Sequence, residues 1–311
     1  HFGGGRGRGG FSGRRGVPPV VLKAMGVVGV SGVAYYVTHL ETIPISNRSH
    51  FVATSPASER AASDEMYQQV LQGKMGPVLP PRHPATQIVM RVSKRIIKEV
   101  DKLVAAGGPG SYGHLEGIEW RFTVVDSPQC NAFVMPGGQV VVFSGLMHLL
   151  RSDKELAAVI GHEIAHVVAR HSAEKVSRGV TTTLLAAVVG AATGLGVRFM
   201  SGAAALGLEL PNSRQMELEA DAIGLQIMAQ ACYDPNAAVT VFEKLGKAER
   251  AAGTSLPEYL STHPASKGRV EKIREGLPAA IERFNSNPKC AARRGFGDAF
   301  STGVFAAGGE G

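Results

Sequence analysis

The sequence predicts an α+β protein that is mainly helical, with a small antiparallel sheet and one N-terminal transmembrane helix. Three observations predict this class. Residues 85–106 carry apolar side chains at helical spacing, residues 119–126 and 139–145 have the alternation or β-branching of strands, and residues 20–37 contain only one charge, Lys23. The chain has 311 residues, 44% of them hydrophobic, which is enough for a substantial core.

The basic character of the chain is concentrated at its N-terminus. The net charge is +7, yet residues 1–40 hold five basic residues and no acid, so the remainder is close to neutral. Residues 1–18 are Gly/Arg-rich, which is typical of an organelle-targeting or flexible tail. A nucleic-acid-binding arm is the weaker alternative because no second basic block follows it. We therefore expect no nucleic-acid partner.

Residues 19–38 are predicted to be a single membrane anchor. Their apolar run of eighteen residues is at the lower limit for a span, and Tyr35 and Tyr36 stand where an interfacial belt would lie. The alternative is a buried Gly-rich helix or a signal-peptide core. The positive-inside rule places the basic N-terminal side in the matrix or the cytoplasm.

The rest of the chain divides into three parts. Residues 39–84 are expected to be an irregular lead-in, residues 85–284 the main domain, and residues 285–311 a disordered tail. Within the main domain, helices are predicted at 85–106, from Ser152 through about His171, at 213–230, after Asp234-Pro235 and at about 266–275.

Cysteine usage gives little information. Cys130, Cys232 and Cys290 form no metal-binding spacing and leave an odd residue over. We expect ordinary buried or free thiols and no disulfide framework.

A His-Glu-x-x-His pattern stands on the helix that Ser152 is predicted to cap. His162 and His166 are one turn apart, so both imidazoles can grip one metal ion, and Glu163 beside them can act on the attacking water. The pattern alone also occurs by chance in unrelated helices, but the capped, inward-packed helix favours a metal site.

His171 is not expected to complete this site. It follows His166 by five residues, and on a continuing helix it would point about 140° away from His166. We predict a packing histidine, favoured at a helix C-terminus by the helix dipole.

A carboxylate from another helix is the expected third ligand. Glu217 and Asp221 are four residues apart and share a face, whereas Glu219 lies on another face. This geometry favours Glu217 as the ligand and Asp221 as an acceptor that orients a histidine N–H. The alternative is a solvated acidic helix face.

Four segments in order resemble one family: GHEIAHVVARH at 161–171, ELEAD at 217–221, NAFVMPGGQVVVFSGL at 131–146 and STHPASKGR at 261–269. The chain is similar to the zinc metallopeptidases that include the CAAX prenyl proteases and HtpX, and most of all to the Oma-type branch of the mitochondrial inner membrane. The resemblance covers roughly residues 41–280. It implies a gluzincin-type domain with one Zn²⁺ per chain.

The resemblance also implies roles for particular residues. Zinc would be held by His162, His166 and Glu217, with Glu163 as catalytic acid/base and with His263 and Arg269 near the metal. His263 would bind the oxyanion or temporarily block the open position of the metal. Peptide substrates are expected to add to the strand Gln139–Phe143 (Gln139, Val140 and Val141) as to an edge, with further contacts at Asn131 and Ala132.

Residues 180–210 form a hydrophobic segment between the histidine helix and Glu217. We expect a membrane-apposed helical pair or a lid over the cleft, because the run after Arg198 is too short for a return pass.

The predicted function is a membrane-anchored zinc metalloendopeptidase that cleaves membrane proteins in quality control or stress response. It would lie in the mitochondrial inner membrane with its catalytic domain in the intermembrane space. The alternatives are a bacterial envelope protease and a non-catalytic zinc-containing scaffold or chaperone. Expected partners are membrane protein or peptide substrates and the lipid bilayer, and homo-oligomerisation is left open.

Overall fold

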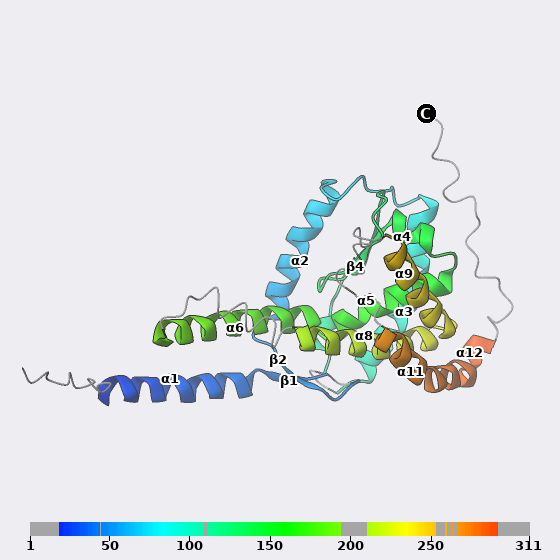
Figure 1. Ribbon diagram of the computed structural model, residues 1–311. Coiled ribbons are helices and arrows are strands. Elements are labelled where there is room, and N and C mark those ends of the chain that lie inside the picture. Colours follow the sequence, from blue (N-terminus) through cyan, green and yellow to red (C-terminus); the bar gives the residue numbers. More distant parts are fainter. Residues whose placement is uncertain are drawn as a thin grey trace, which may run out of the picture. The chain divides into compact units, whose positions relative to one another are not determined.

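The computed structural model describes residues 19–43, 45–108, 111–193, 210–252, 259, 263 and 267–291 (Figure 1). The chain forms two compact units, residues 1–40 and 41–311. The first unit contains helix α1 (Pro19–Thr38), so the predicted N-terminal helix is present. Among the described residues no helix combines the length and hydropathy of a membrane span, and the anchor stays a prediction. The expected tail at 1–18 lies outside the described residues.

The lead-in expected to be irregular is instead structured. It contains a hairpin of β1 (Leu40–Thr42) and β2 (Ser49–Phe51), followed by helix α2 (Pro56–Leu71). Ser55 caps α2 by accepting a hydrogen bond from the Ser58 amide at 3.2 Å, with Pro56 in the first turn. Ser55 followed by Pro56 is a local N-cap pattern, so the start of this helix is visible in the sequence.

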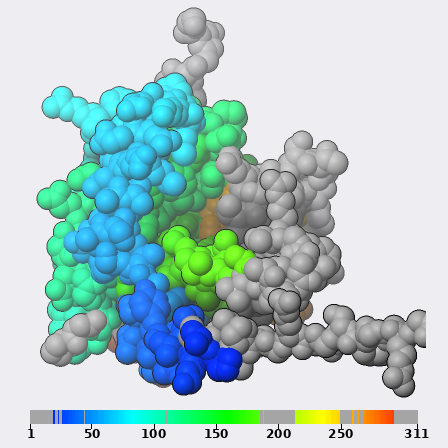
Figure 2. Space-filling model, turned by 90° about the vertical axis from the view of Figure 1, so that its left-hand side faces the viewer, coloured from blue at the N-terminus to red at the C-terminus, as the bar shows by residue number. Residues whose placement is uncertain are grey.

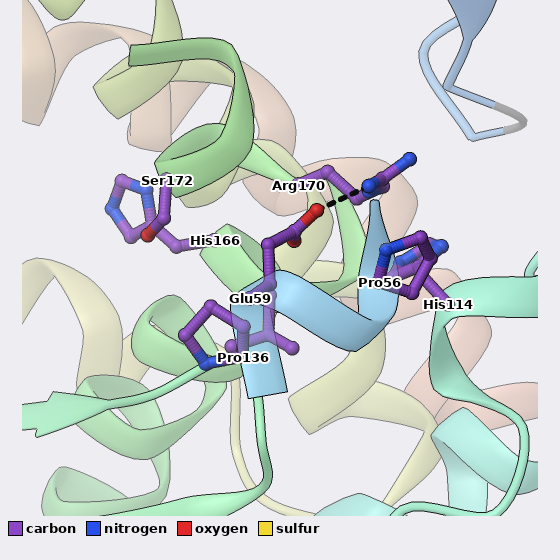
Figure 3. A pocket seen from close by; sticks show the side chains of 8 residues that line it. Pro56, Glu59, His114, Pro136, His166, Arg170 and Ser172 are labelled. Atoms are coloured by element: carbon purple, nitrogen blue, oxygen red, sulfur yellow. Dashed lines mark hydrogen bonds and ion pairs between the residues drawn. The ribbon is translucent and has the colours of Figure 1, made fainter. Parts of the chain in front are cut away.

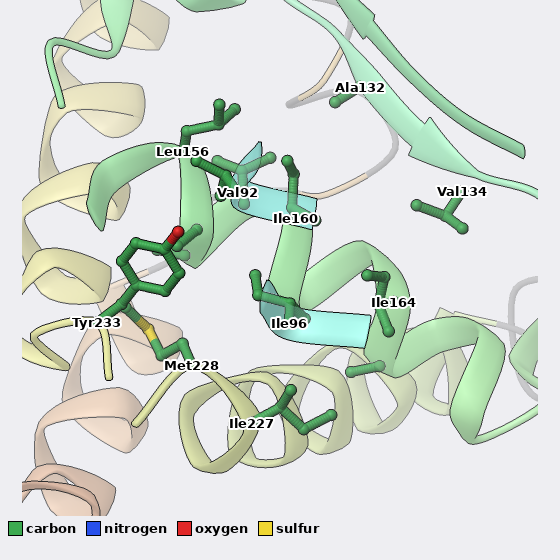
Figure 4. Packing of buried hydrophobic residues seen from close by; sticks show 14 of the residues in the cluster. Val92, Ile96, Ala132, Val134, Leu156, Ile160, Ile164, Ile227, Met228 and Tyr233 are labelled. Atoms are coloured by element: carbon green, nitrogen blue, oxygen red, sulfur yellow. The ribbon is translucent and has the colours of Figure 1, made fainter. Parts of the chain in front are cut away.

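The core of the second unit is built on helices α3 (Pro84–Ala106), α5 (Asp153–Val168) and α8 (Leu210–Gln230). Figure 4 shows α3 and α5 packing their apolar side chains against each other and against α8. The stripe expected on 85–106 is confirmed, and its members Ile88, Val89, Val92, Ile96 and Val100 are all buried. Ser152 caps α5 as predicted, accepting from the Glu155 amide at 3.4 Å.

The predicted sheet exists, but its arrangement differs from the expectation. Strands β3 (Arg121–Val125) and β5 (Gln139–Phe143) are parallel, and the short strand β4 (Ala132–Val134) is antiparallel to β5. The order is β3-β5-β4, because the turn at residues 135–138 joins β4 to β5 while β3 occupies the opposite edge. β5 is therefore the central strand and β4 is an edge. Gln139, Val140 and Val141 do not form the edge that the sequence analysis expected.

Helices α5 and α8 approach each other closely at a pair of glycines. A Cβ on Gly224 would lie 2.9 Å from the carbonyl group of Gly161 and from the amide nitrogen of His162. This contact lets α8 bring its acidic residues up to the histidines of α5.

The helix that carries the histidines does not continue through His171. α5 ends at Val168, and Arg170 has a positive φ of 52°, after which α6 (His171–Thr193) starts in a new direction. The buried Arg170 side chain holds the junction by donating to Glu41, Glu59 and the Thr54 carbonyl. The second half of the segment expected to be a lid, residues 194–209, lies outside the described residues.

The described C-terminal part contains α9 (Asn236–Ala252), α11 (Lys267–Ser286) and α12 (Pro288–Ala291). The short elements η1 (Gly113–Leu115) and α4 (Ser144–Leu149) also belong to the second unit. A disulfide joins Cys232 to Cys290, and Cys130 is a free thiol. The expectation of no disulfide was wrong because the pairing depends on chain topology and not on a local spacing. Residues 285–291, expected to begin the tail, are largely helical, and 292–311 lie outside the described residues.

Candidate metal centre

Three predicted ligands meet between α5 and α8. The Nε2 atoms of His162 and His166 are 3.1 Å apart, and the Glu217 carboxylate lies 3.3 Å from the first and 3.5 Å from the second. All three side chains are buried. The helical offset of four residues thus places both imidazoles on the face of α5 that meets α8.

His263 joins this group from a distant part of the chain. Its Nδ1 is 2.9 Å from Glu217 Oε2 and 3.3 Å from His162 Nε2. One ligand atom from each of the four residues lies within 4.8 Å of the others. Its ring is also 4.8 Å, centroid to centroid, from that of Tyr259, a fully buried residue that sequence reasoning did not single out. No sequence motif marked Tyr259.

Glu163 lies beside the cluster without being part of it. The side chain is buried, and its Oε1 accepts no hydrogen bond from the described residues. His263 Nε2 lies 3.5 Å from this oxygen. A buried carboxylate oxygen without a donor is costly to leave unsatisfied, so its place is explained best by a proton-carrying ligand.

Asp221 and Arg269 support the opposite side of His162. Asp221 Oδ1 is 2.9 Å from His162 Nδ1, which is the second-layer contact that the sequence analysis expected. Arg269 donates to both oxygens of Asp221, at 2.9 and 2.7 Å, and its Nη1 is 3.1 Å from Glu217. Burial alone would lower the pKa of His162, but the close carboxylates of Asp221 and Glu217 outweigh it and raise this pKa to about 9.

His171 does not point away from the site, so that expectation was wrong. Because the chain turns at Arg170, between α5 and α6, the Nδ1 atoms of His171 and His166 are 2.8 Å apart. His171 Nε2 lies 3.0 Å from Glu219 Oε2. Burial lowers the pKa of His171, although the hydrogen bond to Glu219 opposes this. Glu219 is outside the ligand cluster, as its helical position indicates.

The residues expected to contact substrate fall into two groups. Asn131 and Ala132 stand at the start of the edge strand β4, where the Asn131 side chain accepts from the Ala132 amide at 2.9 Å. Gln139, Val140 and Val141 are buried in the central strand, whose two sides are paired with β3 and β4. They cannot receive an additional strand.

A groove of about 580 Å³ borders β4. Its walls come from α2, from the Phe133–Pro136 segment and from the first turns of α6, including Met66, Phe133, Met135 and Val176. Figure 2 shows the blue surface of α2 adjoining the bright-green surface of α6 on this face. A smaller pocket shares Glu59, Pro136 and Ser172 with the groove and reaches His166. Figure 3 shows Glu59 of α2 paired with Arg170 across this pocket.

The donor set suits a divalent metal. Two imidazole nitrogens and a carboxylate converge, and each histidine has a partner for its other ring nitrogen, as is usual for metal-binding histidines. With Glu163 alongside, the fold and this site define a metallopeptidase. The comparison with protein families agrees: the chain belongs to peptidase family M48, whose model matches residues 93–276. It is a metalloendopeptidase, and the family relationship implies a catalytic metal.

Two fungal relatives cover most of the chain. The mitochondrial metalloendopeptidase OMA1 of Schizosaccharomyces pombe is 42% identical over 263 residues, covering 84% of this chain and 74% of the relative. OMA1 of Saccharomyces cerevisiae is 35% identical, covering 81% of this chain and 73% of the relative. The metalloprotease LoiP of Escherichia coli is 32% identical, covering only 53% of this chain and 66% of LoiP.

Proposed function

We propose that this metalloendopeptidase uses one Zn²⁺ ion held by His162, His166 and Glu217. The observation that carries the proposal is the convergence of these ligand atoms beside Glu163, a buried carboxylate with an unsatisfied oxygen. Two histidines and one glutamate are a usual ligand set for catalytic zinc, which keeps a further position open for water or substrate.

Zinc bound there would acidify a water molecule and polarise the scissile carbonyl. The protein's own contribution to the proton transfers is Glu163. Its Oε1 takes a proton from the attacking water and later delivers it to the nitrogen of the leaving amine.

His263 has two roles in the proposal. In the arrangement described here its Nδ1 lies with the ligand atoms, 2.9 Å from Glu217, where it would fill the fourth position. Displacement by the substrate would free the ring to donate a hydrogen bond to the developing oxyanion. Arg269 acts less directly, because its bonds to Asp221 and its contact with Glu217 fix the two carboxylates that face His162.

We propose that the substrate backbone pairs with β4 and not with β5. Phe133 is opposite Val141, and its backbone groups face β5, so those of Ala132 and Val134 point to the open edge. An extended peptide can add a strand there. The groove beside β4 is lined mainly by apolar side chains and would take apolar side chains of the substrate.

The proposed substrates are membrane proteins, and the proposed location is the mitochondrial inner membrane with the catalytic unit in the intermembrane space. The two fungal mitochondrial relatives match more than four-fifths of the chain, whereas the bacterial metalloprotease LoiP matches about half, which favours this location over a bacterial envelope. Exposed valines on α1 are consistent with an anchor in lipid. The disulfide supports a compartment more oxidising than the matrix.

One observation favours the alternative of a non-catalytic scaffold. Four protein ligands are typical of structural zinc, and His263 could be a permanent fourth. The unsatisfied oxygen of Glu163 favours catalysis, because a purely structural zinc site does not require a buried carboxylate beside the ligands.

Glu163→Gln is the variant that decides between these functions. The full chain would be placed in lipid vesicles with a tethered, unstructured test peptide, and cleavage and bound zinc would both be measured. We expect Glu163→Gln to retain one zinc per chain and to cut at least ~100-fold more slowly, since it loses its general base. Equal cleavage by both forms would refute the assigned role.

Glu155→Gln is a matched control for this experiment. Glu155 is also a buried glutamate of α5, but it pairs with Lys244 and lies outside the metal cluster. We expect this variant to cut at the wild-type rate. If the wild type holds zinc without cutting, the scaffold function is supported.

A further inference from the structure

We infer that His171 is a positioning residue for the metal ligand His166, and that the hairpin of residues 41–51 completes the metal centre through it. This inference rests on the zinc site proposed above. It concerns residues that are outside the ligand set and, for the hairpin, outside the segment matched by the family model.

The two ring nitrogens of His166 have different tasks. Nε2 faces the other ligands, 3.1 Å from His162 Nε2 and 3.5 Å from Glu217. A neutral imidazole that offers Nε2 to a metal must carry its proton on Nδ1. That atom lies 2.8 Å from His171 Nδ1, so His166 donates and His171 accepts.

The same reasoning fixes the tautomer of His171. With Nδ1 as acceptor, its proton is on Nε2, which donates to Glu219 Oε2 at 3.0 Å. His162 has the simpler arrangement, because its Nδ1 faces the Asp221 carboxylate directly at 2.9 Å. Each ligand histidine is therefore oriented by a carboxylate of α8. Asp221 contacts His162 directly, whereas the His171 ring lies between His166 and Glu219.

Glu219 is in turn held by the hairpin. It accepts from the Arg48 Nε at 2.8 Å and from the Ser46 hydroxyl. The terminal nitrogens of Arg48 donate to Glu174 at 3.0 and 2.7 Å, and His50 lies 2.9 Å from the same carboxylate. Asn47, with a φ of 55°, makes the turn that places Ser46 and Arg48 side by side.

Burial makes each contact in this network hard to replace. His171 and Glu174 are each 1% exposed, and Glu219 is 8% exposed, so water cannot easily replace a lost partner. Loss of Arg48 would release Glu219, and loss of Glu219 would let the His171 and His166 rings rotate. Partners of this kind are worth about 10- to 100-fold in metal affinity.

The test measures zinc affinity of the full chain by competition with a chromophoric chelator, with zinc alone as the probe. His171→Leu removes both hydrogen bonds, and we expect a loss of about 10- to 100-fold. His171→Asn keeps an acceptor near the Nδ1 position, and its loss should be below about tenfold. Melting of each variant with the metal chelated shows whether the fold itself is retained, and the visible spectrum of bound Co²⁺ reports the ligand geometry.

The hairpin is tested by Arg48→Met and Glu219→Gln, for which we expect a loss of about three- to tenfold. Arg91→Met is the matched control, because Arg91 also makes a two-pronged ion pair, with Asp153 of α5, but far from the cluster. Its zinc affinity should equal that of the wild type.

Wild-type zinc affinity and an unchanged Co²⁺ spectrum in folded His171→Leu would overturn the inference. If that variant does not fold, wild-type affinity in both His171→Asn and Glu219→Gln overturns it instead. Equal affinities of Arg48→Met and Arg91→Met would remove the hairpin from the metal centre. A wild type that binds no zinc would instead refute the proposed function, so the two failures are distinguishable.

Discussion

The two ligand histidines of α5 are one turn apart but are held in different ways. His162 lies at the glycine contact between α5 and α8, where backbone meets backbone, and its outer nitrogen faces a carboxylate directly. His166 depends on a chain of polar side chains that runs to a hairpin far away in the sequence. His162 is held by close packing and His166 by a network of charged side chains. A substitution that adds volume should therefore disturb the first support, and removal of a charge or a fall in pH the second.

Gly224→Ala tests the packed support and should have the largest effect on stability. The new Cβ would lie 2.9 Å from backbone atoms of Gly161 and His162, which cannot move as the end of a side chain can. We expect a loss of about 3 kcal/mol in the free energy of unfolding, measured with denaturant. Gly179→Ala, on α6 with nothing within 4 Å of its Cβ, should be neutral or stabilising by about 0.5 kcal/mol. Equal effects of the two variants would contradict the packing argument.

Glu174→Gln tests the charge network and should cost about 2 kcal/mol at neutral pH, because Arg48 and His50 lose their hydrogen bonds to a shared, charged carboxylate. Burial alone would raise the pKa of Glu174, but hydrogen bonds from His50 and Arg48 lower it well below its ordinary value of 4.5.

The lowered pKa of Glu174 determines how the effect of this substitution depends on pH. A carboxyl with a depressed pKa stabilises the folded state fully above its ordinary value of 4.5, and the stabilisation is lost as the pH falls below it. The difference between wild type and Glu174→Gln should therefore be constant from pH 6 to 7 and should shrink from about pH 4.5 downwards. Unfolding curves across this range measure it, and a constant difference at acid pH would refute the assignment.

Arg91→Met should have the smallest effect. Arg91 also pairs with α5, through Asp153, but its side chain is 55% exposed. Pairs of this kind contribute less than about 1 kcal/mol. Thermal melting that shows a loss as large as that of Glu174→Gln would mean that burial is not what separates the two networks.

The surroundings of His162 could largely be predicted from the sequence, whereas the support of His166 could not. The heptad-like stripe of α3, the cap at Ser152 and the pair Glu217/Asp221 all follow from local spacing, and the structure brings the two acids to His162 as expected. The role of His171 could not be predicted in this way. The rotation of about 100° per residue that gives a side chain's direction holds only within one continuous helix. Arg170 has a positive φ and interrupts the helix one residue before His171, so the helical direction no longer applies there.

The other differences have the same origin in long-range contacts. β4 has only three residues, too few for a clear alternation, and so the sequence predicts its neighbour β5 as the edge. The disulfide joins cysteines 58 positions apart, and only the packing of α12 near the end of α8 brings them together. Local patterns cannot report such pairings.

The spread of the site along the chain also determines when it can form. Ser46 and Arg48 reach Glu219 across 173 and 171 positions, and His162 meets His263 across 101. Contacts of such separation close only after the intervening segments have collapsed, late in folding. A nascent chain that has already emerged with its His-Glu-x-x-His helix therefore lacks an assembled peptidase site until nearly all of the domain has been synthesised.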